Sequence, residues 1–291
     1  MSGMHRDRID PGGQGGLRLT IQIVTAVILN GYAAGFAGGK LYAGDLKKVC
    51  VPVLNCYSCP GAVGSCPVGA LQTLLGSHGR FPFYVLGTLM LFGILLGRAV
   101  CGFFCPFGLV QDLLGKIPVK KLRVPKRIDR PARYVKYIVL VLLVLIPVLS
   151  KVGEPVFCKY LCPAGTLEAG IPLMIADPAL RVLRGVLFHW KIALLAIILV
   201  SVVFIPRCFC RYLCTLGAFY SLFNRFSIFE MTVEKNRCVE CHTCDSVCPM
   251  ALDVTKEIHS AECICCGRCK VSCPEQAIRS GIRVAEDTEF N

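Results

Sequence analysis

The segment CVECHTCDSVCP at residues 238–249 contains four cysteines with the spacing C-x2-C-x2-C-x3-C, followed by a proline. Residues 263–274, CICCGRCKVSCP, repeat both the spacing and the proline. Three closely spaced thiolates are able to bind three irons of one cubane, and the remaining iron then takes a thiolate from elsewhere in the chain. Pairs of the form C-x2-C also bind zinc, but two complete copies with both prolines argue against a zinc site.

This doubled pattern is typical of bacterial ferredoxins with two [4Fe–4S] clusters, in which the last cysteine of each motif binds the other cluster. It therefore predicts two ligand sets. The first set is Cys238, Cys241, Cys244 and Cys273, and the second is Cys263, Cys266, Cys269 and Cys248. Cys265 lies outside the spacing, and we expect no ligand role for it.

The composition favours a membrane protein that binds metal through thiolates. Of 291 residues, 54% are hydrophobic and 18% are charged, against the roughly 25% charged that is usual for soluble domains. The mean hydropathy is +0.60. A chain with 20 cysteines that is this long and apolar does not resemble a small disulfide-bonded secreted protein.

Four apolar stretches approach the length of about 20 residues that a bilayer-crossing helix needs. They cover residues 17–43, 81–100, 134–150 and 190–205. Nine basic residues and one acid, Asp129, lie between Lys116 and Lys136, which predicts by the positive-inside rule that this loop is cytoplasmic. With four spans, both termini are then cytoplasmic and loops 44–80 and 151–189 face outward.

The positive-inside rule explains the excess of basic residues behind the net charge of +13. We therefore expect no nucleic-acid partner. From Glu230 onward the chain has 7 Lys and Arg against 11 Asp and Glu, a net charge of −4, which leaves +17 for the remainder. The acidic charge therefore lies in the ferredoxin-like region and the basic charge around the apolar stretches.

A second motif occurs four times, each time as a cysteine followed by glycine three residues later and then by an apolar segment. The copies are SCPVGALQTLLG from Ser65, FCPFGLVQDLLG from Phe104, LCPAGTLEAGIP from Leu161 and LCTLGAFYSLFN from Leu213. In the last three copies another cysteine precedes by four residues. This internal repetition of the motif predicts that the four spans form two parallel repeats related by an axis along the membrane normal.

On this topology the repeat axis brings cysteines together on each face of the membrane. We predict an inner set consisting of Cys101, Cys105, Cys210 and Cys214. On the outer face we expect Cys59, Cys66, Cys158 and Cys162 to lie together. Soft thiolate sets favour iron–sulfur clusters, but two alternatives stay open: the inner thiols could act in redox exchange or packing, and the outer ones could form disulfides. Cys50 and Cys208 have no repeat partner.

The four spans, CGFFCPFG at residues 101–108, CRYLC at residues 210–214 and the terminal two-cluster segment together resemble the NapH/NosR-type membrane ferredoxins. The resemblance covers residues 17–280. It implies a polytopic protein that passes electrons to or from quinol during anaerobic respiration. The sequence departs from the simplest pattern in its extra CYSCPGAVGSCPVGALQ loop at residues 56–72 and in the missing proline after CRYLC.

We therefore predict a mainly α fold, with a four-helix transmembrane domain of two parallel repeats and a small α+β two-cluster ferredoxin domain at the C-terminus. The predicted domains are a cytoplasmic tail at residues 1–16, the membrane domain at 17–229 and the ferredoxin domain at 230–291. Two [4Fe–4S] clusters are expected in the last domain, one or two further clusters in the membrane domain, and quinone as a further ligand.

The predicted function is electron transfer between a cytoplasmic redox partner, or other subunits of a membrane complex, and quinone or an outer-face partner in the cytoplasmic membrane. The sequence has no Ser/His/Asp arrangement, Walker loop or dinucleotide fingerprint, so we expect a quinone-linked or non-catalytic component of an oxidoreductase complex. Two alternatives are a membrane thiol–disulfide oxidoreductase fed by the ferredoxin domain, and a redox-sensing regulatory or maturation protein.

We predict that replacing Cys244 or Cys269 with serine removes the spectroscopic signal of one cluster and destabilises the whole terminal segment. The reason is that metal ligation replaces a hydrophobic core that is too small to fold alone. Iron content and circular dichroism of each variant test this. Retention of both clusters in either variant would show that the ligand assignment is wrong.

Overall fold

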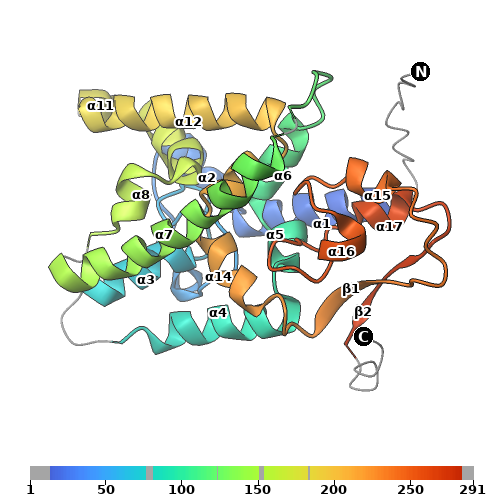
Figure 1. Ribbon diagram of the computed structural model, residues 1–291. Coiled ribbons are helices and arrows are strands. Elements are labelled where there is room, and N and C mark those ends of the chain that lie inside the picture. The colour runs from blue at the N-terminus through green and yellow to red at the C-terminus, as the bar shows by residue number, and fades with distance from the viewer. Residues whose placement is uncertain (1–13, 77–80, 123, 151–153, 183, 284–291) are drawn as a thin grey trace.

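The computed structural model describes residues 14–76, 81–122, 124–150, 154–182 and 184–283 (Figure 1). Within these ranges the protein is mainly helical, with one two-stranded sheet near the C-terminus. Most of the predicted N-terminal tail, residues 1–13, and the last residues of the predicted ferredoxin domain, 284–291, lie outside the described residues.

Two helices, α7 (Lys126–Ser150) and α12 (Val186–Phe204), are long and apolar enough to cross a membrane. They contain the third and fourth predicted apolar stretches. Only 17% of the most apolar part of each helix is buried inside the structure. A core helix of a soluble protein would be mostly buried, so these helices present apolar side chains outward.

The first two apolar stretches form shorter helices, α1 (Gln14–Leu29) and α4 (Phe83–Leu96). The first stretch was expected to continue to residue 43, but its helix ends at Leu29. The side-chain amide of Asn30 donates to the Ala26 carbonyl at 3.1 Å and to Asn55 Oδ1 at 3.0 Å, and the chain turns before α2 (Ala33–Gly38). Helix α4 ends at Gly97, whose φ of 53° lies in the region that favours glycine.

Each copy of the cysteine–glycine motif opens a helix immediately after its cysteine. These helices are α3 (Pro67–Gly76), α6 (Pro106–Leu114), α9 (Pro163–Gly165) and α14 (Thr215–Phe223). Helix α9 continues through a π-helical turn, η2 (Thr166–Gly170), into α10 (Ile171–Ala176). Proline fits the first helical position because its ring already has a helical φ and the missing N–H is not needed there.

Three further short helices precede the motif cysteines or lie beside them: α5 (Ala99–Phe103), α8 (Val156–Tyr160) and α13 (Cys208–Tyr212). The remaining elements of this part are η1 (Asp45–Lys48) and α11 (Pro178–Val182). Helix α6 packs against α1 and α12, and α14 packs in the equivalent way against α7 and α4. Helices α6 and α14 thus each contact one apolar helix of their own half of the chain and one apolar helix of the other half.

The ferredoxin segment, residues 229–283, lies at one end of the long helices, where Figure 1 shows it in orange to red. Strand β1 (Phe229–Val233) pairs antiparallel with β2 (Ile278–Ile282), and α15 (Thr243–Ser246), α16 (Val254–Glu257) and α17 (Arg268–Ser272) lie between them in sequence. Backbone φ is positive at three equivalent positions of its two motifs. The pairs are Glu240 and Cys265, His242 and Gly267, and Ala251 and Gln276. The two halves therefore follow the same path, and Cys265 serves as a turn residue.

Gly102 in α5 is a point of close contact with the ferredoxin segment. A Cβ added at Gly102 would overlap the carbonyl oxygen of Ile264 and lie 3.7 Å from the Cα of Cys266. Ile264 is 1% exposed and belongs to the same core as Cys101 and Cys105. The ferredoxin segment is thus packed onto α5 without room for a further carbon atom.

We predict that Gly102→Ala destabilises the protein by about 1–3 kcal/mol, because the backbone of the ferredoxin segment has to move away from α5. Thermal unfolding and limited proteolysis of the full chain measure this. Gly87→Ala in α4 is the matched control, since nothing lies within 4 Å of a Cβ built there. Equal stability of the two variants would contradict the close packing at Gly102.

Candidate iron–sulfur sites

The ferredoxin segment contains two cavities, and each is lined by four cysteines. The first cavity is lined by the distal set: Cys238, Cys241, Cys244 and Cys273. The second is lined by the proximal set: Cys248, Cys263, Cys266 and Cys269. The structure therefore exchanges Cys248 and Cys273 between the motifs, which is the grouping that the spacing predicts.

The chemistry of these cavities fits an iron–sulfur cluster. Four sulfur atoms surround each space, and the other lining residues are largely apolar, such as Val233, Ile258 and Leu252. Burial raises the pKa of Cys248 to about 12 and that of Cys244 to about 11, whereas a hydrogen bond from Cys265 lowers the pKa of Cys263 to about 7. Buried thiols that resist ionisation become ligands when a cation supplies the opposing charge.

The inner set brings together one pair of cysteines from each half of the helical region before β1. Cys101, Cys105, Cys210 and Cys214 are each no more than 7% exposed. Their thiol groups lie close together, because Cys214 interacts electrostatically with Cys101, Cys105 and Cys210. Beneath them, the rings of Phe107 and Phe209 from the two halves meet edge to face with centroids 5.1 Å apart.

Helix N-termini point at the sulfur atoms of the motif cysteines. The backbone N–H of Gly217 donates to Cys214 Sγ at 3.3 Å, and Gly108 donates to Cys105 in the same way. Cys66 and Cys162 accept equivalent bonds from Gly69 and Gly165. Burial raises the pKa of all four thiols, and these bonds and the positive end of the helix partly offset that effect in favour of the thiolate. This is the physical reason for the glycine three residues after each cysteine.

Two arginines connect the halves of the inner set in a reciprocal way. Arg98 lies three residues before Cys101 and donates from Nη2 to the Cys210 carbonyl at 3.3 Å. Arg207 lies three residues before Cys210 and donates from Nη1 to the Cys101 carbonyl at 3.0 Å. Both arginines are buried, with 0% and 1% exposed. Neither arginine belongs to a motif recognised from the sequence, although both stand three residues before a motif cysteine.

Each of these arginines also reaches the ferredoxin segment through a carboxylate. Arg98 Nη1 binds Glu262 Oε2 at 2.9 Å, and Glu262 directly precedes Cys263. Arg207 Nε binds Asp112 Oδ1 at 3.1 Å, and Asp112 in turn binds Arg268, which directly precedes Cys269. The inner set and the proximal set are therefore joined by two continuous chains of ion pairs.

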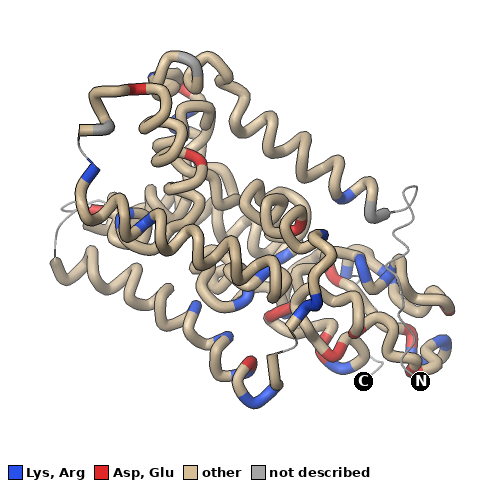
Figure 2. Tube along the Cα trace, turned by 90° about the horizontal axis from the view of Figure 1, so that it is seen from above, with Lys and Arg blue, Asp and Glu red and all other residues tan. Residues whose placement is uncertain are grey.

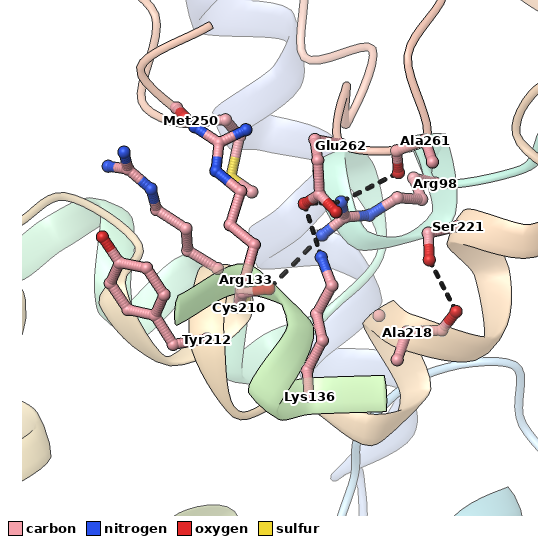
Figure 3. Close-up of polar contacts among 12 residues, drawn as sticks. Arg98, Arg133, Lys136, Cys210, Tyr212, Ala218, Ser221, Met250, Ala261 and Glu262 are labelled. Carbon is pink, nitrogen blue, oxygen red and sulfur yellow. Dashed lines mark hydrogen bonds and ion pairs between the residues drawn. The ribbon is translucent and has the colours of Figure 1, made fainter. Parts of the chain in front are cut away.

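The carboxylates in these chains are held in the ionised form. Burial would raise the pKa of Asp112, but Arg207, together with Arg18 and Arg268, lowers it well below its usual range. Burial would likewise raise the pKa of Glu262, and Arg98 and Lys136 lower it. Figure 3 shows Arg98, Lys136 and Glu262 pointing toward one another.

The outer set differs from the expectation at one position. The structure brings Cys66, Cys158 and Cys162 together with Cys56 rather than with Cys59. A Cβ built at Gly165 would lie 3.6 Å from Cys56 Sγ and 4.0 Å from Cys162 Sγ, and one at Gly69 would lie 3.5 Å from Cys158 Sγ. We call Cys56, Cys66, Cys158 and Cys162 the outer set.

Tight turns explain the position of Cys59. Its N–H donates to the Cys56 carbonyl, and the N–H of Ala62 donates to the Cys59 carbonyl. The chain reverses there, and Cys59 Sγ lies 3.5 Å from Asn30 Oδ1 at the end of α1. Cys56 has its own anchor, because its N–H donates to Glu168 Oε2 at 2.7 Å.

Tyr220 lies between the inner and outer sets. It is fully buried, its hydroxyl donates to the Pro52 carbonyl at 2.7 Å, and it is within electrostatic range of Cys101 and Cys66. Of the two cysteines without a repeat partner, Cys50 is also close to Tyr220, and Cys208 is half-buried near Arg211.

A sequence profile described as "4Fe-4S binding domain" matches residues 81–125, 135–171 and 186–230. Each matched piece contains one motif of two cysteines four residues apart. No solved structure matches the chain.

Similar proteins include the protein MJ0750 of Methanocaldococcus jannaschii, which is 32% identical over 70% of this chain and 80% of its own length. The "Ferredoxin-type protein NapH" of Haemophilus influenzae is 27% identical over 75% of both chains. The "Putative electron transport protein YccM" of Escherichia coli is 26% identical over 74% of this chain. The alignment covers 62% of YccM, so the chain spans less than two thirds of that relative.

The four-sulfur cavities and the repeated cysteine–glycine helices define a 4Fe-4S binding protein of the ferredoxin type. The chain belongs to the family that shares this 4Fe-4S binding domain with MJ0750, NapH and YccM, an iron–sulfur family of electron-transport proteins. The resemblance drawn from the sequence motifs is thereby confirmed.

We predict that Cys56→Ser lowers the iron bound by the anaerobically purified chain, whereas Cys59→Ser leaves it unchanged. Only Cys56 lies with Cys66, Cys158 and Cys162, so only its loss opens the four-sulfur set. Iron and acid-labile sulfide analysis measures both variants. Loss of iron in Cys59→Ser alone would contradict the grouping.

Proposed function

We propose that the chain is an integral membrane iron–sulfur protein that conducts electrons between a cytoplasmic redox partner and the membrane interior. The observation that carries this proposal is the serial arrangement of the cysteine sets. The distal set includes the exposed Cys241, the proximal set packs against α5, and Tyr220 links the inner set to the outer set. A bound [4Fe–4S] cluster supplies reversible one-electron transfer at each set.

The membrane location rests on four apolar helices, α1, α4, α7 and α12, that expose large side chains. Examples are Ile28 at 66%, Phe83 at 76%, Leu149 at 77% and Ile197 at 63% exposed. Exposure of so many apolar side chains to water is unfavourable, whereas their contact with lipid is favourable. We propose that the four helices span the cytoplasmic membrane as two parallel repeats, and that a bend at Gly97 joins α4 to α5 within one span.

The orientation rests on the basic residues. Figure 2 shows that the long helices carry little charge along most of their length and that charged residues gather near the ferredoxin segment. The basic run from Lys116 to Lys136 leads into α7 at this end, which supports a cytoplasmic position of the ferredoxin segment by the positive-inside rule. Residues 17–229 then form the membrane domain, and the segment from residue 230 onward forms the ferredoxin domain.

The protein's own residues perform three tasks in this proposal. The apolar lining around the proximal and inner sets excludes water. Excluding water lowers the reorganisation energy of electron transfer at these sets. The N–H groups of the motif glycines hold the sulfur atoms in place. The exposed distal set, in an acidic segment, offers a docking point for a cytoplasmic carrier or another subunit.

The function is tested with the full chain in lipid vesicles that contain a membrane-confined quinone. A reduced, membrane-impermeant low-potential dye is added on the side of the ferredoxin segment, and quinone reduction is followed by absorbance. We expect dye oxidation coupled to quinone reduction. Intact clusters without any electron transfer would overturn the proposal and favour a redox-sensing role.

We further predict that Cys105→Ser and Cys214→Ser lose the same spectroscopic species, and that the double variant loses nothing more. Residues that act as one unit are not additive, and these two cysteines come from different halves of one set. Electron paramagnetic resonance of the reduced protein measures the species, with Cys208→Ser as the control from the same helix pair. Independent losses in the two variants would show that the pairs are not one site.

A further inference from the structure

The inner set is surrounded by more buried positive charge than negative charge. Among the described residues, five buried cationic side chains lie in this region: Arg18, Arg98, Lys136, Arg207 and Arg211. Three carboxylates pair with them: Asp112, Asp129 and Glu262. Five minus three leaves a surplus of two positive charges, and the partly buried Arg133 and Arg268 add to it.

Buried charge without a counterion is costly, so the surplus indicates a missing anion. A [4Fe–4S] cluster with four thiolates carries a net charge of about −2 in its oxidised form. Four neutral thiols would carry none and would leave the cations uncompensated. The charge count therefore fits anionic centres at the inner set and at the adjacent proximal set, whose Cys266 is within electrostatic range of Arg18 and Arg207.

Arg98 and Arg207 are the members of this shell that bind the backbone of the inner-set cysteines. Each donates to the carbonyl of a first cysteine in the other half, Cys210 or Cys101. An uncharged donor adds to them, because Gln111 Nε2 donates to Cys210 Sγ at 3.1 Å. Positive charge and hydrogen bonds to sulfur both stabilise the form of a cluster that has taken up an electron.

The other cysteine sets have different surroundings. The distal set is more exposed and lies beside acidic residues, since Asp245 Oδ1 is 3.7 Å from Cys244 Sγ and Glu275 lines the same cavity. At the outer set, Lys47 donates to the Ala62 carbonyl, Lys191 donates to the Cys158 carbonyl, and Glu168 accepts from the backbone N–H of Cys56. No arginine is among these contacts. Positive charge is thus greater at the inner set than at the distal set, and Arg207 acts more strongly on Cys210 of the inner set than on Cys266 of the proximal set.

We propose that Arg98 and Arg207 tune the inner set to the highest reduction potential in the series, so that electrons entering at the distal set collect there. The inference rests on the proposed function, because it needs a redox centre at the inner set. In this step one electron leaves a reduced centre in the ferredoxin segment and one oxidised centre at the inner set takes it up, with no bond made or broken. The inference assigns a direction, from the cytoplasmic face inward.

The test is a redox titration of the full, anaerobically purified chain, followed by electron paramagnetic resonance. The inner species is first identified as the one that Cys105→Ser removes. Arg98→Gln and Arg207→Gln are each expected to lower the reduction potential of this species. Arg98→Lys is expected to keep the potential close to that of the unchanged protein, because lysine keeps the positive charge. Arg130→Gln is the control, since Arg130 is exposed and pairs only loosely with Glu257 at 3.8 Å.

A second variant avoids leaving a carboxylate without its partner, in case the arginine variants fail to fold. Gln111→Leu removes the hydrogen bond to Cys210 Sγ and is expected to lower the potential of the inner species. Gln72→Leu is the matched control, because Gln72 is the equivalent residue of the first motif copy, is fully buried and has no side-chain hydrogen bond within the described residues.

Three outcomes separate the inference from the proposed function. Absence of any species that Cys105→Ser removes would overturn the proposed function itself. An inner species whose potential does not change in Arg98→Gln, Arg207→Gln or Gln111→Leu would overturn only the tuning role. An inner potential below that of the ferredoxin-segment species would overturn the direction of transfer.

Discussion

The burial of four cysteines between the two halves of the helical region constrains how the other parts of the chain are arranged. Sulfur atoms that bind a cluster there need positive charge and N–H donors beside them. The donors come from helix N-termini, where Gly108 and Gly217 bind the sulfur atoms of Cys105 and Cys214. The positive charge comes from Arg98 and Arg207, each from the opposite half. The two-fold arrangement of the motif is thus a direct consequence of needing the same donors on both sides of one site.

The same arginines fix the position of the ferredoxin segment. Glu262 and Arg268 stand directly before Cys263 and Cys269, and both take part in ion pairs that end at the inner set. Lys136 and Arg133 add contacts from α7, to Glu262 and to the Met250 carbonyl. Buried pairs of this kind are costly to break, so they hold the proximal set in a fixed position relative to the inner set.

The sequence predicted those features that depend on local spacing. The grouping of Cys248 with Cys263 followed from the two-cluster pattern, and the pairing of Cys105 with Cys214 followed from the internal repeat. It did not predict that Cys56 takes the place expected for Cys59, because two successive backbone turns decide which side chain faces the set. The early end of α1 at Leu29 depends on a tertiary bond from Asn30 to Asn55, which no local pattern reveals.

The basic run between Lys116 and Lys136 shows a further limit of sequence reasoning. Its charge was interpreted through the positive-inside rule, but Arg133 and Lys136 also bind the ferredoxin segment. One stretch of sequence thus serves two electrostatic roles, and composition alone does not separate them. The role of Arg98 could not be predicted from the sequence, because an isolated arginine at the end of an apolar stretch forms no distinctive pattern.

The central claim is that the inner set holds a redox centre in addition to those of the ferredoxin segment. Its most direct test is the measurement of iron and acid-labile sulfide per chain on the anaerobically purified protein, combined with Mössbauer spectroscopy to identify the cluster type. The account predicts three or four [4Fe–4S] clusters per chain. Iron for two clusters only, in a protein whose ferredoxin segment is fully loaded, would contradict it.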